Sequence, residues 1–242
     1  MTDLPDPKQA ADLLVQLRKL EEVSHRRVEG NDLPSQLAMF RAWQAQRLAT
    51  TYADLLASKR FGPACHFFLD DIYGPQDFTQ RDHDIVRIHN FMLRFLPASV
   101  LGPLTKAIEL NSMTMELDDQ LLRVLVDDLG VTDNITAQQY AEGYRICDNY
   151  DERRRQIEMI GEVGRGIARL VRIPFLGLTL RLTRGPAQRG GWYEMQGFLE
   201  RGFSAFKRMG SKADTFINTL QQREMQILDR FFANSENPFD VD

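Results

Sequence analysis

Two histidines, an aspartate and a tyrosine within residues 62–96 have the residue types and the spacing that acid–base or metal chemistry requires. His66, Asp70 and Tyr73 are spaced i, i+4 and i+7, so they share one flank of the first helix predicted in this segment. His89 lies on the apolar stripe of the second predicted helix. If the two helices form an antiparallel hairpin, the two imidazoles lie at similar heights, where they can bind a transition metal or transfer protons.

The same residues also fit a structural network without chemistry. In that alternative, Asp70 accepts a hydrogen bond from His66, while Tyr73 and His89 find backbone or side-chain partners. The sequence lacks Glu-x-x-His motifs on two helices, which a di-iron bundle requires, and it contains no phosphate-binding loop, dinucleotide fingerprint or nucleophile elbow. No cofactor and no metal is therefore assigned, and the four residues remain candidates for catalysis.

The first helix of this segment carries an aromatic and acidic motif. The motif runs Phe67-Phe68-Leu69-Asp70-Asp71-Ile72-Tyr73-Gly74-Pro75, and Asp77-Phe78 and Arg81-Asp82 follow it. It resembles the signature of the bacterial FFLEELY-motif proteins, with Asp70 and Asp71 in place of Glu and Ile72 in place of Leu. The resemblance implies a bacterial, all-helical protein of similar size, and it implies no catalytic residue.

Hydrophobic residues recur with a period near 3.6 along almost the whole chain, which predicts helices. Around the motif, one apolar stripe has the spacing i, i+3, i+4 and i+7: Cys65, Phe68, Leu69 and Ile72. The predicted fold is therefore all-α. We expect a single multi-helix bundle of about nine or ten helices over residues 1–233, followed by a loose C-terminal tail over residues 234–242.

Two features of the C-terminal half concern packing. Gly161, Gly164 and Gly166 fall inside a predicted helix, where they are expected to permit close helix packing rather than to hold phosphate. Residues 175–184 fit a short helix, although the alternation from Leu178 to Leu182 also fits a strand.

Length and composition are those of a soluble globular protein. The chain has 242 residues, of which 43% are hydrophobic and 26% are charged, and this suffices for a core without metal or disulfide. The longest uncharged run, residues 95–105, has 11 residues, whereas a membrane-spanning helix needs about 20. The N-terminal residues contain no apolar stretch and the two cysteines make no disulfide framework, so we expect no secretory signal, no transmembrane segment and a cytoplasmic location.

Charge is divided unevenly along the chain. Residues 1–152 contain 15 basic and 24 acidic residues, a net charge of −9. Residues 153–212 contain 13 basic and 4 acidic residues, a net charge of +9, and the remaining residues carry −4. Most of the basic residues in the middle segment are arginines. Arg165, Arg169 and Arg172 share one face of a predicted helix, because they are spaced i, i+4 and i+7.

Two interpretations of this arginine-rich segment remain open. The arginines could pair with the acidic residues of 1–152, because a guanidinium binds a carboxylate through two parallel hydrogen bonds. They could instead form a docking face for an acidic protein, a lipid headgroup surface or nucleic acid. Nucleic acid is disfavoured by a pI of about 5.7 and by the absence of a binding motif. An interfacial membrane role would use residues 175–180 beside Arg181 and Arg184, but the segment is short, and packing of its leucines in the core is preferred.

The sequence thus favours a soluble bacterial helical protein that acts as a non-enzymatic interaction module, with an arginine-rich face for an anionic partner. The predicted partner-binding residues are Arg165, Arg169, Arg172, Arg181 and Arg184. The alternative is a small-ligand or metal-dependent enzyme that uses the histidine, aspartate and tyrosine cluster of residues 62–96. Neither a reaction, a partner nor an oligomeric state follows from the sequence.

Overall fold

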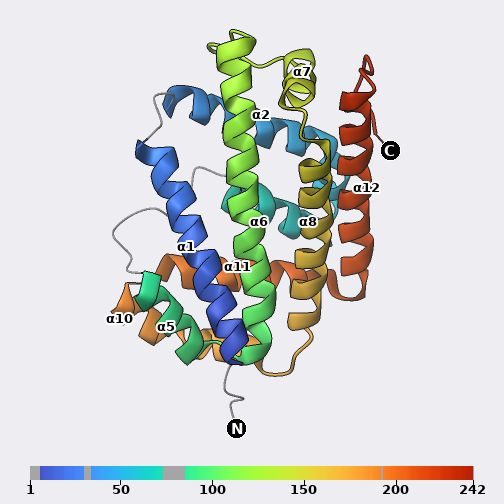
Figure 1. The fold of residues 1–242 in the computed structure, drawn as a ribbon. Helices are drawn as coiled ribbons and strands as arrows, with labels where there is room; N and C mark the ends of the chain where they lie inside the picture. Colours follow the sequence, from blue (N-terminus) through green and yellow to red (C-terminus); the bar gives the residue numbers. More distant parts are fainter. Residues whose placement is uncertain (1–5, 30–33, 73–84, 192, 242) are drawn as a thin grey trace.

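The protein is almost entirely helical. The computed structural model describes residues 6–29, 34–72, 85–191 and 193–241, and no strand occurs among them (Figure 1). The α-helices are α1 (Pro7–Glu29), α2 (Pro34–Thr51), α3 (Ala53–Ala57), α4 (Gly62–His66), α5 (Ile85–Phe95), α6 (Ala98–Arg123), α7 (Ala137–Cys147), α8 (Tyr150–Leu170), α9 (Leu176–Leu182), α10 (Arg184–Gly190), α11 (Tyr193–Met209) and α12 (Ala213–Phe232). Two π-helical segments, η1 (Phe67–Ile72) and η2 (Val124–Asp128), continue α4 and α6, and a 3-10 turn, η3 (Gly210–Lys212), joins α11 to α12. The all-α prediction is confirmed, and the segment that also fitted a strand is the helix α9.

Four long helices form the frame of the bundle. α1 packs against α6, α6 packs against α8, and α8 packs against α12, so the four helices lie side by side in this order (Figure 1). α2 and α11 run across them behind this layer in the view of Figure 1. Within the described ranges, no helix combines the length and the apolar character that crossing a membrane would require.

Three clusters of buried side chains fill the space between the helices. The first, around Tyr140 and Phe231, joins α2, α6, α7, α8 and α12. The second, around Phe67 and Phe206, joins α3, α4, α11 and α12. The third, around Leu101, joins α1, α5, α6 and α9. The aromatic motif therefore inserts into the core, as its apolar stripe predicts.

The register of that insertion differs from the prediction. Cys65 is buried as expected, but Phe67 is the aromatic residue that is fully buried, with 7% of its surface exposed, whereas Phe68 is half-buried. The cause is the π-helix η1, because its i to i+5 bonding places more residues in each turn and rotates the side chains away from α-helical spacing. Gly202 in α11 makes room for the Phe67 ring, since a Cβ at this position would lie 2.9 Å from it.

Side-chain caps and glycines explain how the helices around the first cluster are placed. Thr136 and Gln139 form a capping box that starts α7, with Thr136 Oγ1 accepting from the Gln139 backbone N–H at 3.2 Å. Gly161 and Gly164 let α8 approach α12 closely, because a Cβ at Gly164 would lie 3.0 Å from Ile217. This confirms that these glycines permit helix packing.

The C-terminal segment is not the loose tail that the sequence predicts. No regular helix follows α12, but the described residues after it fold back onto the bundle. The ring of Phe239 packs against Trp43, Tyr140 and Phe231 at centroid distances of 6.0, 6.3 and 5.3 Å. The half-buried ring of Phe239 therefore anchors a segment that the sequence analysis expected to be loose.

Candidate functional site

One chain segment at an end of the bundle is strongly basic. It is formed by the C-terminal part of α8, by α9 and by α10. Residues 163–193 contain six arginines and neither aspartate nor glutamate. In Figure 1 this segment lies at the bottom of the bundle, with α10 at the lower left. Leu176 fixes α9 to the bundle, because its side chain belongs to the buried cluster of α1, α5 and α6.

The helix α9 buries one apolar stripe and exposes another. Leu176 and Leu180 are 5% and 7% exposed and face the core. Phe175, Leu178 and Leu182 are 79%, 52% and 69% exposed. Leu178 and Leu182 share one side of α9, because they are spaced i and i+4, and Phe175 directly precedes the helix. A protein in water gains nothing from presenting three large apolar side chains together, so this stripe indicates a contact surface.

The backbone at Phe175 is strained in a way that presents its ring to solvent. Phe175 adopts the left-handed conformation with φ of 65° and ψ of −6°, just before α9 begins. A bulky residue in this conformation costs about 1–3 kcal/mol. Ile173, two residues before Phe175, is 38% exposed and extends the apolar surface. Strain at an exposed aromatic residue favours a binding role, because packing of the free protein does not require the ring to be there.

The five predicted partner-binding arginines occupy different environments. Arg169, Arg172 and Arg181 are exposed, and their side chains have no hydrogen-bond or ion-pair partner within the described part of the chain. Arg165 donates instead to Gln221 Oε1 in α12 at 2.8 Å. The fifth residue, Arg184, is paired with a carboxylate.

The partner of Arg184 is Glu200 in α11. Arg184 Nε donates to Glu200 Oε1 at 2.6 Å, and a second guanidinium nitrogen binds the other carboxylate oxygen. This hydrogen bonding lowers the pKa of Glu200, and burial opposes the shift. The charge of Arg184 is therefore balanced, whereas Arg169, Arg172 and Arg181 form no hydrogen bond or ion pair in the described structure, and the charge of Arg181 also contributes to lowering the pKa of Glu200.

The sequence pattern missed the exposed stripe, although it contains a signal for it. Leucine recurs at every second position from 176 to 182. In a helix this spacing places apolar side chains on two opposite sides, and only one of these sides can face the core. Core packing, which the sequence analysis preferred, is correct for Leu176 and Leu180 but wrong for Leu178 and Leu182.

The histidines do not form the predicted facing pair. His66 is exposed at the end of α4, whereas His89 Nε2 lies 2.8 Å from the carbonyl oxygen of Ala10 in α1. α4 packs against α3 and α11, while α5 packs against α1 and α6, so the predicted antiparallel hairpin is wrong. Tyr73 and the side chain of Asp70 lie outside the described residues. Among the residues described, no group of three or more His, Cys, Asp or Glu side chains could hold a metal.

A second set of arginines is buried among α2, α6, α7, α8 and α12. Arg153 donates to Asp118 Oδ1 at 3.2 Å, and its guanidinium lies 4.7 Å above the ring of Tyr144. Arg47 donates to Glu224 Oε1 at 2.6 Å. The Nε of each arginine is buried without a hydrogen-bond partner among the described residues, beside a cavity of about 40 Å³. Such a volume holds ordered water, which would satisfy these donors.

The charges of this buried cluster are balanced. Burial alone would lower the pKa of Arg47, but Glu224 and the phenols of Tyr140 and Tyr144 outweigh it and raise the pKa above its usual value. Burial also raises the pKa of Tyr144 well above its usual value, so this phenol is neutral. Two cations therefore face two carboxylates, and the raised pKa values of Arg47, Arg153 and Tyr144 keep these three groups from titrating near neutral pH. The arrangement is suited to holding five helices together rather than to chemistry.

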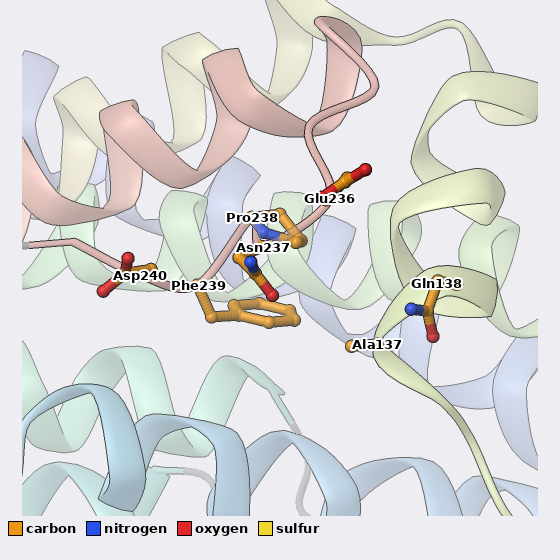
Figure 2. Close-up of a pocket in the computed structure, with 7 residues that line it drawn as sticks. All are labelled: Ala137, Gln138, Glu236, Asn237, Pro238, Phe239 and Asp240. Atoms are coloured by element: carbon orange, nitrogen blue, oxygen red, sulfur yellow. The ribbon is translucent and has the colours of Figure 1, made fainter.

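A shallow recess lies where the C-terminal segment meets the start of α7. It has a volume of about 310 Å³ and is lined by Ala137, Gln138 and residues 236–240. Figure 2 shows the ring of Phe239 beneath Asn237, while the carboxylates of Glu236 and Asp240 extend in opposite directions. Because these acidic groups diverge, they cannot bind one cation together, and the recess offers no convergent set of catalytic groups.

Comparison with known proteins identifies a family and nothing more specific. No match is found among curated proteins or among solved structures. A family model described as Domain of unknown function (DUF8198) matches residues 23–238. The matched range contains α2 to α12 completely and includes the basic end of the bundle. Since the match covers far more than half of the chain, the protein belongs to the DUF8198 family.

Proposed function

We propose that this protein is an interaction module that binds an anionic partner through the basic end of its bundle. The surface concerned, called the basic-apolar face below, consists of Arg169, Arg172, Ile173, Phe175, Leu178, Arg181 and Leu182. Binding through this face requires charge attraction and burial of apolar surface, and it requires no catalytic group.

The observation that carries the proposal is the absence of acidic residues from a segment of 31 residues that contains six arginines. Protein surfaces usually intersperse charges of both signs, which cancels long-range fields. A surface with one sign of charge creates a positive potential that attracts anions and speeds their association. The exposure of Arg169 and Arg172, which have no partner in the described structure, supports an uncompensated charge at this face. Arg181 is also exposed and forms no hydrogen bond or ion pair there, although its charge contributes to lowering the pKa of Glu200.

Pairing inside the protein is the competing explanation for the arginine-rich segment. It applies to Arg153, which binds Asp118 of α6, and to Arg155, which binds Glu162 in its own helix. It does not apply to the arginines of the basic-apolar face. The segment therefore divides into arginines that stabilise the fold and arginines that remain available to a partner.

Charge reversal with a matched control tests the proposal. The face variant carries Arg169→Glu, Arg172→Glu and Arg181→Glu. The control variant carries Arg18→Glu, Arg60→Glu and Arg208→Glu, which are exposed arginines elsewhere and change the net charge equally. Binding of each protein to immobilised polyglutamate and to phosphatidylserine-containing vesicles is then measured at about 0.15 M salt, where charges separated by more than about 8 Å are screened.

We expect the wild-type protein to bind at least one of the two probes. The face variant should bind that probe at least tenfold more weakly, while the control variant should stay within twofold of wild type. Equal loss in both variants would mean that net charge, and not this face, determines binding. Absence of wild-type binding to both probes would also contradict the proposal.

A further inference from the structure

We infer that the partner of the basic-apolar face is the surface of an anionic lipid bilayer. The inference rests on the proposed function and names its partner. Phe175, Leu178 and Leu182 enter the boundary between headgroups and acyl chains. Arg169, Arg172 and Arg181 bind the lipid phosphates around them. The chain thus lies on the membrane at this end of the bundle.

The first support is the concentration of exposed apolar side chains. Eight large hydrophobic residues are exposed in the described structure, and five of them lie between Ile173 and Tyr193. The other three, Val15, Val86 and Ile146, come from three different helices. Single exposed apolar residues are ordinary, whereas a group of them marks a protein or membrane contact.

The second support is the firm attachment of α9 behind its exposed stripe. Leu176 and Leu180 are buried on the opposite side of the helix. Thr183 Oγ1 lies 2.8 Å from the Leu180 carbonyl oxygen and 3.0 Å from Gln196 Oε1 of α11, so its one proton can be donated to either acceptor. The stripe is therefore held outward by the body of the protein. A helix lying in a membrane interface buries its apolar face to a depth of about 5–10 Å, which side chains of this size can reach.

The third support is the arrangement of charge around the stripe. Arg181 precedes Leu182 directly and follows Leu178 by three residues, so cations flank the apolar side chains. The aliphatic part of an arginine can lie against apolar surface while its guanidinium stays among the headgroups. Each basic residue close to an anionic membrane strengthens binding about fivefold. Acidic residues, which such a membrane repels, are absent from residues 163–193.

Other occupants fit this surface less well. In a symmetric dimer the same patch meets itself, so the uncompensated arginines of two copies would repel one another. An acidic peptide usually lies in a groove, where its side chains fill pockets. The cavity and the recess described above are both lined by residues outside the basic-apolar face. A bilayer requires only projecting apolar side chains and nearby cations, and the face supplies both.

Vesicle flotation with the full chain tests the inference. The vesicles consist of phosphatidylcholine alone or of phosphatidylcholine with phosphatidylserine. The insertion variant carries Phe175→Ala, Leu178→Ala and Leu182→Ala, and its control carries Val15→Ala and Ile146→Ala, which are exposed apolar positions elsewhere. We expect wild type to bind the anionic vesicles at least tenfold better than the neutral ones. The insertion variant should lose at least tenfold, and its control should not change more than twofold.

The outcomes separate this inference from the proposed function. Binding to polyglutamate without binding to anionic vesicles overturns the lipid partner and leaves the proposed function standing. Binding to neither probe overturns both. Vesicle binding that is lost in the charge-reversal variant but unchanged in the insertion variant overturns the insertion of the apolar stripe.

A fluorescence measurement reports insertion directly and does not depend on a loss of binding. Phe175→Trp places an indole in the stripe, and wild-type protein gives the background from Trp43 and Trp192. On anionic vesicles with brominated acyl chains, the added fluorescence should shift to shorter wavelength and be quenched. Added fluorescence that remains unquenched while the protein is bound would overturn the inference.

Discussion

The protein keeps arginines in two contrasting environments. Two of them lie inside the bundle. Arg47 is 2.6 Å from the carboxylate of Glu224, and Arg153 is 3.2 Å from that of Asp118. Arg169, Arg172 and Arg181 are exposed, and no partner for them occurs in the described structure. The residue type is the same, but its surroundings decide whether it stabilises the fold or remains available to bind.

The difference lies in where acidic residues occur in the chain. The N-terminal 152 residues supply 24 acidic residues, and the helices α6 and α12 place Asp118 and Glu224 next to the buried arginines. Residues 163–193 supply none. A guanidinium without a nearby carboxylate is stable only in water or against an external anion, so the local acid content separates the arginines that stabilise the fold from those that stay exposed.

The largest effect should come from the buried environment. Arg153→Leu removes the cation beside Asp118, while the carboxylate stays buried. We expect the free energy of unfolding to fall by about 3–5 kcal/mol, because an unpaired buried charge is strongly destabilising. Urea denaturation followed by circular dichroism measures the loss.

The neighbouring position supplies the control for this prediction. Arg154 forms an exposed ion pair with Glu158 at 3.2 Å, so Arg154→Leu should cost no more than about 1 kcal/mol. Adding Asp118→Leu to Arg153→Leu should recover part of the stability, since it removes the stranded charge. Similar losses in both single variants would remove the distinction between the two environments.

A smaller loss of stability should follow from adding a side chain where α8 packs against α12. A Cβ at Gly161 would lie 2.1 Å from the carboxamide of Gln221, the residue that accepts a hydrogen bond from Arg165. Gly161→Ala should therefore destabilise by about 1–3 kcal/mol, as overpacking does. Thermal unfolding of this variant measures the loss.

Much of the fold could be predicted from local signals. Period-3.6 spacing predicts the helices, the Thr136 cap predicts the start of α7, and the glycines predict the close contact of α8 with α12. The register of Phe67 could not be predicted, because π-helical bonding in η1 depends on tertiary packing rather than on residue type. The place of Phe239 was missed for the same reason, since its partners come from three distant helices.

The candidate site was predictable in charge but not in shape. The count of acids and bases identifies the basic segment, and it names Arg169, Arg172 and Arg181. Sequence alone could not separate them from Arg184, because Glu200 reaches it only when α11 folds back beside α10. The histidine pair failed because a periodic pattern gives the faces of two helices but not which helices pack together.

An exposed ion pair should give the free energy of unfolding a small pH dependence. Hydrogen bonds from Lys106 and Arg155 lower the pKa of Glu162 to about 2, against 4.5 for the free side chain. A lowered pKa means that this stabilisation is fully present above pH 4.5 and is lost as the pH falls toward 2. Solvent screening limits it to about 0.5–1 kcal/mol. Between pH 7 and pH 3, the free energy of unfolding should fall less in the Glu162→Gln variant than in the wild-type protein. An identical loss in both proteins would mean that the ion pairs of Glu162 contribute nothing to stability.

The smallest effect on stability should come from the basic-apolar face itself. Replacing Arg169, Arg172 and Arg181 by Ala removes no ion pair or hydrogen bond of the described structure. The free energy of unfolding should therefore change by no more than about 0.5 kcal/mol, as at ordinary surface positions. A slight gain is consistent with relief of repulsion among cations on one surface. Urea denaturation measures the change in the free energy of unfolding, and repeating it at low and high salt shows how much of the change is due to charge repulsion. A loss above about 1 kcal/mol would show that these arginines support the fold, and the contrast with Arg153 would then no longer mark a face that is free to bind.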